Sequence, residues 1–238
     1  MQHHQPQMPM SYRSFSPAEL LGPLNEVEQK NAPRTLFVAG NLGILQEGAR
    51  VSIVGARKAS SEGIRRAAKL AGLLARRKIV VVSGLAEGID TAALKTAIEQ
   101  SGFTIAVLGT GLDQVYPREN AELQARIMRE HLALSQYPVG SPIQRKNFPL
   151  RNRTMALFSD ATVIIEASDT SGSLHQGWEA LRLGRPLFIT RSITETPGLT
   201  WPGKMLHYGA SVLSDETFEE FEEALPARMA AHDGGIPF

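Results

Sequence analysis

The amino-acid sequence predicts an α/β fold built on a doubly wound, mostly parallel sheet. Short, β-branched and nearly continuous apolar runs alternate along the chain with segments of helical period, the pattern of a repeated strand–helix unit. A continuous apolar run indicates a strand buried on both faces, as in a parallel sheet between two helix layers. Such an arrangement is an extended Rossmann-like domain. The apolar runs are Val51 to Val54, Ile79 to Val82, Ile105 to Leu108, Val163 to Ile165 and Leu187 to Ile189.

The flanking segments are assigned from local signals. We expect residues 1–31 to comprise a disordered start and a short helix, because the Ser-Pro-Ala-Glu sequence at residues 16–19 fits an N-cap, N1 and N3. Residues 32–214 are expected to form the Rossmann-like domain, with its clearest helical pattern at residues 64–75. Residues 215–238 are predicted to form an acidic C-terminal helix and tail.

The composition excludes several classes of protein. The chain has 238 residues, of which 42% are hydrophobic, so it can bury a sizeable core and is not a disordered tail protein. It has no cysteine, which excludes disulfides, thiol nucleophiles and cysteine-bound metal clusters. No stretch approaches the roughly 20 apolar residues of a membrane span, and no signal peptide pattern is present. We therefore expect a cytoplasmic protein with no membrane contact, metal or cofactor.

The charges are balanced in number but not in position. Lys and Arg total 25 and Asp and Glu total 24, which gives a formal net charge of +1. Residues 57–78 hold eight basic residues and one acid, and residues 145–153 hold four basic residues and no acid. We expect residues 145–153 to form a loop. Residues 215–223 hold six acids, so any affinity for nucleic acid must depend on where the charges sit.

Four predicted strands end in segments rich in Gly, Ser and Thr. Ligands of doubly wound sheets bind outside the carboxyl ends of the strands. There, glycine allows close approach, hydroxyl groups donate hydrogen bonds, and helix N-termini favour anions. We therefore expect one phosphate-binding edge, although no segment matches a dinucleotide or P-loop fingerprint. The segments are Gly55 to Ser60, Ser83 to Asp90, Gly109 to Asp113 and Ser168 to Ser173.

Basic and aromatic residues at this edge point to single-stranded nucleic acid. Arg57 directly follows the first of these strands, where its guanidinium can bind a phosphate with two hydrogen bonds. Phe148 precedes Arg151 and Arg153, which combines a base-stacking platform with two phosphate ligands; a core position is the alternative for Phe148. The predicted DNA or phosphate contacts are Gly55, Arg57, Lys58, Ser83, Gly84, Gly109, Gly111, Phe148, Arg151, Asn152, Arg153, Ser171, Gly172 and Ser173.

Five stretches of the sequence carry the pattern of a known family. They are VSIVGARKASSEGIRRA, VVVSGLAEGIDTAA, TIAVLGTGLDQVYPRENAEL, FPLRNRTMALFS and VIIEASDTSGSLHQGWEALRLGRPLFI. In this order and spacing the chain resembles the DNA-processing protein A (DprA/Smf) family from about Ala32 to Leu213. The resemblance implies a Rossmann-like domain of the DprA/LOG type that binds single-stranded DNA and forms homodimers. It also implies a role in DNA uptake, transformation or recombination, with loading of RecA onto DNA. The sequence ends soon after this domain, so we expect no C-terminal winged helix.

A second class of function remains open at this point, a nucleotide or nucleoside-phosphate sensor or hydrolase of the LOG-like superfamily that acts with a partner protein. The LOG phosphoribohydrolases use a Glu where this chain has Gln176, and an amide cannot act as a general base. We therefore expect no catalytic residue and no enzyme activity. Asp90, His175 and Gln176 are candidate nucleotide contacts, with helix capping an equal alternative for Asp90. The stretch expected to supply a homodimer contact contains Trp201, Met205, Leu206 and Tyr208.

Overall fold

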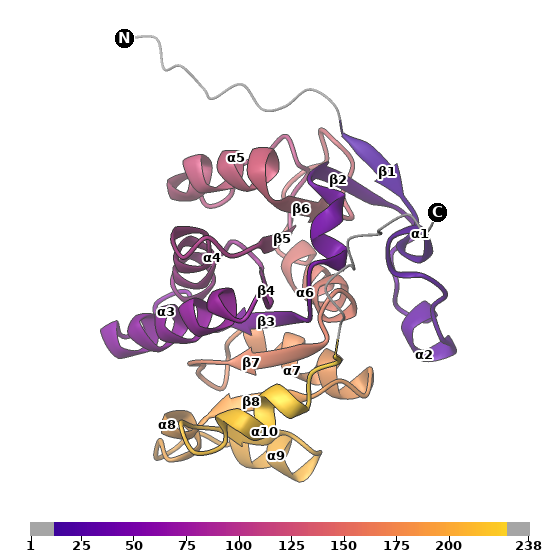
Figure 1. Ribbon diagram of the computed structural model, residues 1–238. Helices are drawn as coiled ribbons and strands as arrows, with labels where there is room; N and C mark the ends of the chain where they lie inside the picture. The colour runs from indigo at the N-terminus through magenta and orange to yellow at the C-terminus, as the bar shows by residue number, and fades with distance from the viewer. Residues whose placement is uncertain (1–11, 228–238) are drawn as a thin grey trace, which may run out of the picture.

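A nine-stranded sheet organises residues 12–227, the part of the chain that this computed structural model describes. The strand order is β1-β2-β6-β5-β4-β3-β7-β8-β9 (Figure 1). Neighbours from β6 to β9 are parallel, whereas β1 with β2 and β2 with β6 are antiparallel. The predicted doubly wound, mostly parallel α/β fold is confirmed. The strands are β1 (Arg13–Phe15), β2 (Leu36–Gly40), β3 (Arg50–Val54), β4 (Val80–Ser83), β5 (Thr104–Leu108), β6 (Leu132–Ser135), β7 (Ala161–Ile164), β8 (Leu187–Thr190) and β9 (Ser211–Leu213).

Helices cover both faces of this sheet (Figure 1). Buried residues of α3, α4, α5 and α10 form one apolar cluster with the sheet, and those of α1, η1, α6, α7, α8 and α9 form the other. Among the described residues, no helix is both long and apolar enough to cross a membrane. The helices are α1 (Pro17–Leu21), α2 (Glu26–Gln29), η1 (Leu42–Gln46), α3 (Ser61–Arg76), α4 (Ile89–Glu99), η2 (Arg118–Asn120), α5 (Ala121–Glu130), α6 (Asn147–Leu157), α7 (Ser173–Arg182), α8 (Arg191–Thr194), α9 (Trp201–His207) and α10 (Phe218–Glu223).

The continuous apolar runs arise because successive residues of the central strands enter opposite layers. In β3, Val51 and Ile53 pack into the cluster that contains α3, and Val54 packs into the cluster on the other face. All five residues of β3 are buried, so neither face shows the polar alternation of a half-exposed strand. β3 lies between β4 and β7 at the centre of the sheet.

The N-terminal capping signal at residues 16–19 is confirmed. The Ser16 hydroxyl accepts a hydrogen bond from the Glu19 N–H, and the Glu19 carboxylate accepts one from the Ser16 N–H at 2.6 Å. The segment before this helix also contributes β1, which pairs with β2 at one edge of the sheet. The expected disorder at the start of the chain falls on residues 1–11, outside the described residues. The same applies to residues 228–238 of the expected acidic tail.

Two local predictions are wrong. Residues 147–157 form helix α6 instead of belonging to a loop. The sequence conceals this helix because polar side chains, those of Asn147, Arg151, Asn152 and Thr154, occupy much of its buried side. In the stretch expected at a dimer surface, Trp201 and Met205 belong to the core, with exposed fractions of 3% and 0%. Leu206 packs against the same core, and Tyr208 is the exposed member.

The buried imidazole of His131 gives a pH-dependent prediction for stability. Burial lowers the pKa of His131 below its ordinary value of 6.5, with Arg126 acting in the same direction and Glu130 opposing it. The unfolded chain therefore takes up a proton more readily than the folded one. The stability that His131 contributes is present above pH 6.5 and is lost as the pH falls below that value, by at most about 1.4 kcal/mol per pH unit. In urea titrations, His131→Gln should lose less stability than the wild type on going from neutral to mildly acidic pH. Parallel pH curves for the two proteins would contradict the prediction.

Candidate functional site

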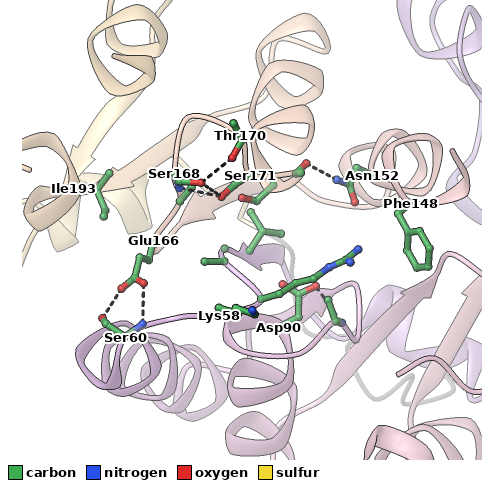
Figure 2. Close-up of a pocket in the computed structure, with 18 of the residues that line it drawn as sticks. Lys58, Ser60, Asp90, Phe148, Asn152, Glu166, Ser168, Thr170, Ser171 and Ile193 are labelled. Atoms are coloured by element: carbon green, nitrogen blue, oxygen red, sulfur yellow. Dashed lines mark hydrogen bonds between the residues drawn. The ribbon is translucent and has the colours of Figure 1, made fainter. Parts of the chain in front are cut away.

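A pocket with a volume of about 1100 Å³ lies outside the carboxyl ends of β3 and β7. The strand order reverses here, because the chain runs from β3 through β4 and β5 to β6 on one side and from β7 through β8 to β9 on the other. Such a switch point leaves a crevice between the loops that follow the two strands. The lining comes from the β3–α3 loop, the β7–α7 loop, α6 and the start of α8 (Figure 2).

Glu166, which follows β7, joins the two loops. Its carboxylate accepts hydrogen bonds from the Ser60 N–H at 2.8 Å and from the Ser60 hydroxyl at 2.5 Å (Figure 2). Its backbone carbonyl accepts a further bond from the Ala56 N–H at 2.7 Å. Ser60 is also the N-cap of α3. These bonds fix the loop from which Arg57 and Lys58 line the pocket.

The serine-rich β7–α7 loop presents the start of a helix to the pocket. The Ser168 N–H donates to the Ser171 hydroxyl at 2.9 Å, which closes the turn before α7. Gly172 is the N-cap and cannot supply a capping side chain. Ser173 is 9% exposed, and its hydroxyl has no hydrogen-bond partner within residues 12–227. An uncapped helix start next to an unpaired hydroxyl is suited to binding an anion.

Arg151 projects from α6 toward the ends of two strands, and its side chain is buried. Its Nη1 donates to the carbonyl oxygens of Gly84 and Val107, the latter at 2.6 Å, and its Nε donates to the Asn152 amide oxygen at 3.0 Å. Arg151 thereby ties α6 to the carboxyl ends of β4 and β5. A Cβ atom at position 84 would collide with the guanidinium, so a larger residue there would displace the Arg151 side chain.

Asp90, in the first turn of α4, is the charged partner of Arg151. Its Oδ2 accepts hydrogen bonds from the Gly84 N–H at 3.1 Å and the Ala86 N–H at 3.4 Å. Burial raises the pKa of the Asp90 carboxyl, and the charge of Arg151 opposes that rise. Burial likewise lowers the pKa of Arg151, with Asp90 acting in the opposite direction. Each ion therefore offsets part of the desolvation cost of the other.

Phe148, one turn before Arg151, forms an aromatic rim with two neighbours. Its ring centroid lies 5.2 Å from that of Tyr116 and 5.2 Å from the Arg57 guanidinium carbon. Tyr116 is exposed, and Phe148 is half-buried and lines the pocket. The Phe148 ring also packs against Gly109, where a Cβ atom would approach it to 2.7 Å. Phe148 is thus packed from behind without being a core residue.

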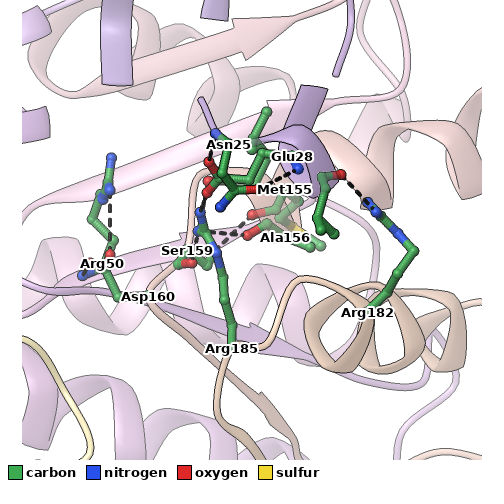
Figure 3. Close-up of polar contacts among 11 residues, drawn as sticks. Asn25, Glu28, Arg50, Met155, Ala156, Ser159, Asp160, Arg182 and Arg185 are labelled. Carbon is green, nitrogen blue, oxygen red and sulfur yellow. Dashed lines mark hydrogen bonds and ion pairs between the residues drawn. The ribbon is translucent and has the colours of Figure 1, made fainter. Parts of the chain in front are cut away.

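Helix α6 is held at its C-terminal end by Arg185 (Figure 3). The guanidinium donates to the carbonyl oxygens of Ala156 at 3.0 Å, Leu157 at 2.7 Å and Ser159. Carbonyls at a helix C-terminus have no partner within the helix, so these bonds satisfy acceptors that the fold leaves open. Arg185 also pairs with Glu28 at 2.8 Å, which attaches α2 to the same point. Arg151 therefore fixes α6 in its middle and Arg185 fixes it at its C-terminal end.

The pocket lining brings together most of the predicted contacts. Ser83 is not among them, because it is fully buried and its hydroxyl donates to the Ile53 carbonyl at 2.7 Å. Gly111 is buried against Pro138 and also lies outside the lining. Gly84 and Gly109 line a smaller adjoining cavity. The predicted residues that line the main pocket are Gly55, Arg57, Lys58, Asp90, Phe148, Arg151, Asn152, Ser171, Gly172 and Ser173.

Three further predicted contacts lie away from the pocket, which corrects the sequence interpretation. Arg153 pairs with Glu179 at 3.1 Å, because residues two apart on a helix point to different sides. His175 is exposed on α7 and is not part of a loop. The Gln176 side chain is fully buried, with its amide 3.2 Å from the Thr162 hydroxyl, so a nucleotide in the pocket does not reach it.

Sequence reasoning overlooked several lining residues. Glu62 and Arg66 belong to the first turns of α3, and Ser192 and Thr196 belong to α8 and the residues after it. A helix that starts at the carboxyl edge of the sheet presents its first two turns to the crevice, and this rule would have identified Arg66. Within the described residues, no cluster of three or more acidic or histidine side chains is placed to hold a metal ion.

Comparison with known proteins identifies a family whose sequences match this chain. The model of the DNA recombination-mediator protein A family matches residues 15–223. The chain is 33% identical over 193 residues to DNA processing protein DprA of Bacillus subtilis, which covers 80% of this chain and 65% of that protein. It is 41% identical over 177 residues to DNA processing protein DprA of Streptococcus pneumoniae, with coverages of 74% and 62%. The chain thus spans less than two-thirds of the length of these two relatives.

Solved structures agree with this result. The crystal structure of Streptococcus pneumoniae DprA superposes with a TM-score of 0.74 at 33% identity, covering 89% of this chain and 75% of that chain. A structure of Helicobacter pylori DNA processing protein A, described for its single-stranded DNA binding mode, has a TM-score of 0.75 at 24% identity, with coverages of 90% and 98%. A molybdenum cofactor binding protein of Rippkaea orientalis shares the fold, with a TM-score of 0.55 at 17% identity over 74% of this chain and 96% of that one. The family model and the relatives confirm the resemblance seen in the sequence motifs, and the chain belongs to the DNA recombination-mediator protein A family.

Proposed function

We propose that this chain is a DNA-processing protein that binds single-stranded DNA through its phosphate backbone, with little dependence on sequence. The observation that carries the proposal is the grouping of Arg57, Lys58, the start of α7 and the Phe148 ring around one pocket. Backbone phosphates require cations and N–H donors, and unpaired bases require a flat ring on which to stack. This pocket offers both kinds of contact.

The phosphate contacts in this proposal come from two sides of the crevice. Arg57 and Lys58 are exposed on the β3–α3 loop. On the β7–α7 loop, the start of α7 has no side-chain cap and presents the positive end of the helix dipole to the pocket. Arg151 adds positive charge to the pocket lining, with its Nη1 and Nε engaged by backbone carbonyls and Asn152.

The relatives support DNA as the ligand. Two of them are named DNA processing proteins, and the Helicobacter pylori protein is described as binding single-stranded DNA. A cytoplasmic location, a homodimer and the loading of RecA onto the bound strand are part of the proposal and follow from the family. An exposed aromatic pair, Trp178 and Tyr208 with ring centroids 5.6 Å apart, supports a contact with a second copy.

A nucleotide ligand is the second candidate, because the pocket volume is close to the range of roughly 300–1,000 Å³ found for small-molecule sites. We propose no hydrolase activity in either case, since Gln176 carries no charge and lies buried in place of the LOG carboxylate. Binding of labelled oligo-dT and of a nucleotide panel, each measured over a range of salt concentrations, separates the candidates. A strand that neutralises several cations shows a steep salt dependence, whereas a mononucleotide does not.

Replacing Arg57 and Lys58 together by Ala should flatten the plot of log K against log salt for oligo-dT. Each neutralised phosphate contributes about 0.7 to that slope for single strands, so the double variant should lose about 1 to 1.5. Oligo-dT and mixed-sequence strands should weaken almost equally, because phosphate contacts carry no base information. A matched control removes two exposed arginines of α5, Arg126 and Arg129, and should leave the slope unchanged. Equal slopes in all three proteins would place the DNA contacts elsewhere.

Replacing Phe148 by Ala should weaken binding in a different way. Loss of a stacking platform costs about 1–3 kcal/mol per base, while the salt slope stays close to that of the wild type because no charge is removed. Phe148→Trp keeps an aromatic face and should retain most of the affinity. If both variants bind DNA as tightly as the wild type, with unchanged circular dichroism, the ring does not stack on a base.

The two arginines of α6 should differ in their effect on folding. Arg151→Met removes the partner of a buried ion and should lower the free energy of unfolding by about 3–5 kcal/mol in urea titrations. Arg153→Met breaks a partly exposed ion pair between α6 and Glu179 of α7, whose carboxylate keeps Arg182 as a partner, and should lower the free energy of unfolding by less than about 1 kcal/mol. Adding Asp90→Asn to Arg151→Met should restore part of the loss, because no buried charge is then left unpaired. Similar stabilities for the two single variants would show that the Arg151 bonds do not hold the strand ends.

A further inference from the structure

Cations on two helices beside the pocket are paired with carboxylates of the acidic C-terminal segment. Lys69 on α3 lies 2.8 Å from Asp215, and Arg191 at the start of α8 lies 2.8 Å from Glu216. At the C-terminal end of α3, the C-cap residue Arg77 pairs with Glu222 of α10. All three cations are well exposed, with side-chain exposures of 63%, 44% and 41% for Lys69, Arg191 and Arg77.

These cations extend the basic lining of the pocket outward. Arg66 lines the pocket, and Lys69 follows it on the same face of α3, since residues three apart on a helix are neighbours. Arg77 lies on the continuation of that face, about 16 Å from Arg66 along the helix axis. On the other side, Arg191 directly precedes Ser192, which is part of the lining. A strand that leaves the pocket over α3 therefore meets a row of positive charges.

The acidic segment does not depend on these ion pairs for its position. Phe221 of α10 is fully buried, and its ring centroid lies 5.0 Å from that of Phe188. The turn before α10 is closed by the Ser214 N–H, which donates to the Thr217 hydroxyl at 2.9 Å. Exposed ion pairs contribute only about 0.2–1 kcal/mol each. Lys69, Arg77 and Arg191 can thus exchange their carboxylate partners for phosphates while the segment stays folded.

We propose that Lys69, Arg77 and Arg191 form a second binding surface for the phosphate backbone of a single strand, outside the pocket, where Asp215, Glu216 and Glu222 act as internal competitors for the phosphates. The surface rests on the proposed function, because it takes the strand that the pocket holds. It binds only strands long enough to leave the pocket and pass over α3.

The test compares Asp215→Asn/Glu216→Gln with a matched control, Glu219→Gln/Glu223→Gln. The control removes the same charge from exposed positions of α10 that form no ion pair with any described residue. Binding of labelled oligo-dT of about 6 and about 30 nucleotides is measured over a salt series for the full chain. The first variant should bind the long strand about tenfold more tightly than the wild type, with a slope steeper by about 1.4. Its affinity for the short strand should match that of the control, and adding Lys69→Ala should abolish part of the gain.

Each other outcome overturns a defined part of the proposal. If the wild type binds oligo-dT and the two double variants behave alike, the second surface is excluded while the proposed function stands. An equal gain for short and long strands also excludes it, since the acids would then act on the pocket through their field alone. If neither the wild type nor any variant binds either strand, both the proposed function and the second surface are wrong.

Discussion

One buried guanidinium holds the site together, that of Arg151. It donates to carbonyl oxygens at the ends of β4 and β5 and interacts electrostatically with the carboxylate of Asp90 at the start of α4. An ion removed from water is tolerated when hydrogen bonds and a nearby counter-charge offset its desolvation, and the bonds of Nη1 and Nε together with the charge of Asp90 do so here. The helix anchored in this way also carries Phe148 and Asn152. The Asn152 side-chain amide donates to the Gly172 carbonyl at 3.0 Å. The rim and the β7–α7 loop therefore depend on the same anchor.

The fold engages some charges of the site and leaves others available to a ligand. Arg151 is balanced by Asp90, and the Glu166 carboxylate is held by Ser60 through two hydrogen bonds. Arg57 keeps its guanidinium exposed at the rim, where its contact is the face of Phe148 rather than a carboxylate. A stacked arginine is held in place without losing its charge. The chemistry of ligand binding in the pocket therefore depends on the side chains that are not already paired with other groups of the protein.

The sequence allowed the sheet and the location of the site to be predicted, because both depend on patterns that repeat. Strands buried on two faces leave continuous apolar runs, and parallel strands bring their carboxyl ends to one edge, which is why Arg57 and Ser173 could be placed together. The direction of single side chains could not be predicted in the same way. If residues 145–153 form a loop, Arg151 and Arg153 can both contact phosphate. In the helix that they actually form, Arg151 is buried and Arg153 pairs with Glu179. Gln176 is expected near the ligand because it occupies the position of the LOG glutamate, but one helical turn carries it into the core.

The near-neutral net charge has a consequence for which nucleic acid such a site would accept. An unscreened basic face along α3 would attract any polyanion, since phosphates alone do not distinguish a single strand from a duplex. Asp215, Glu216 and Glu222 reduce that general attraction by pairing with the exposed cations outside the pocket. Arg57 forms no ion pair with any described residue and stands beside Phe148, where binding also requires an unstacked base. A duplex offers phosphates but keeps its base faces stacked, so in the proposed complex the acidic segment and the aromatic rim together favour the single strand.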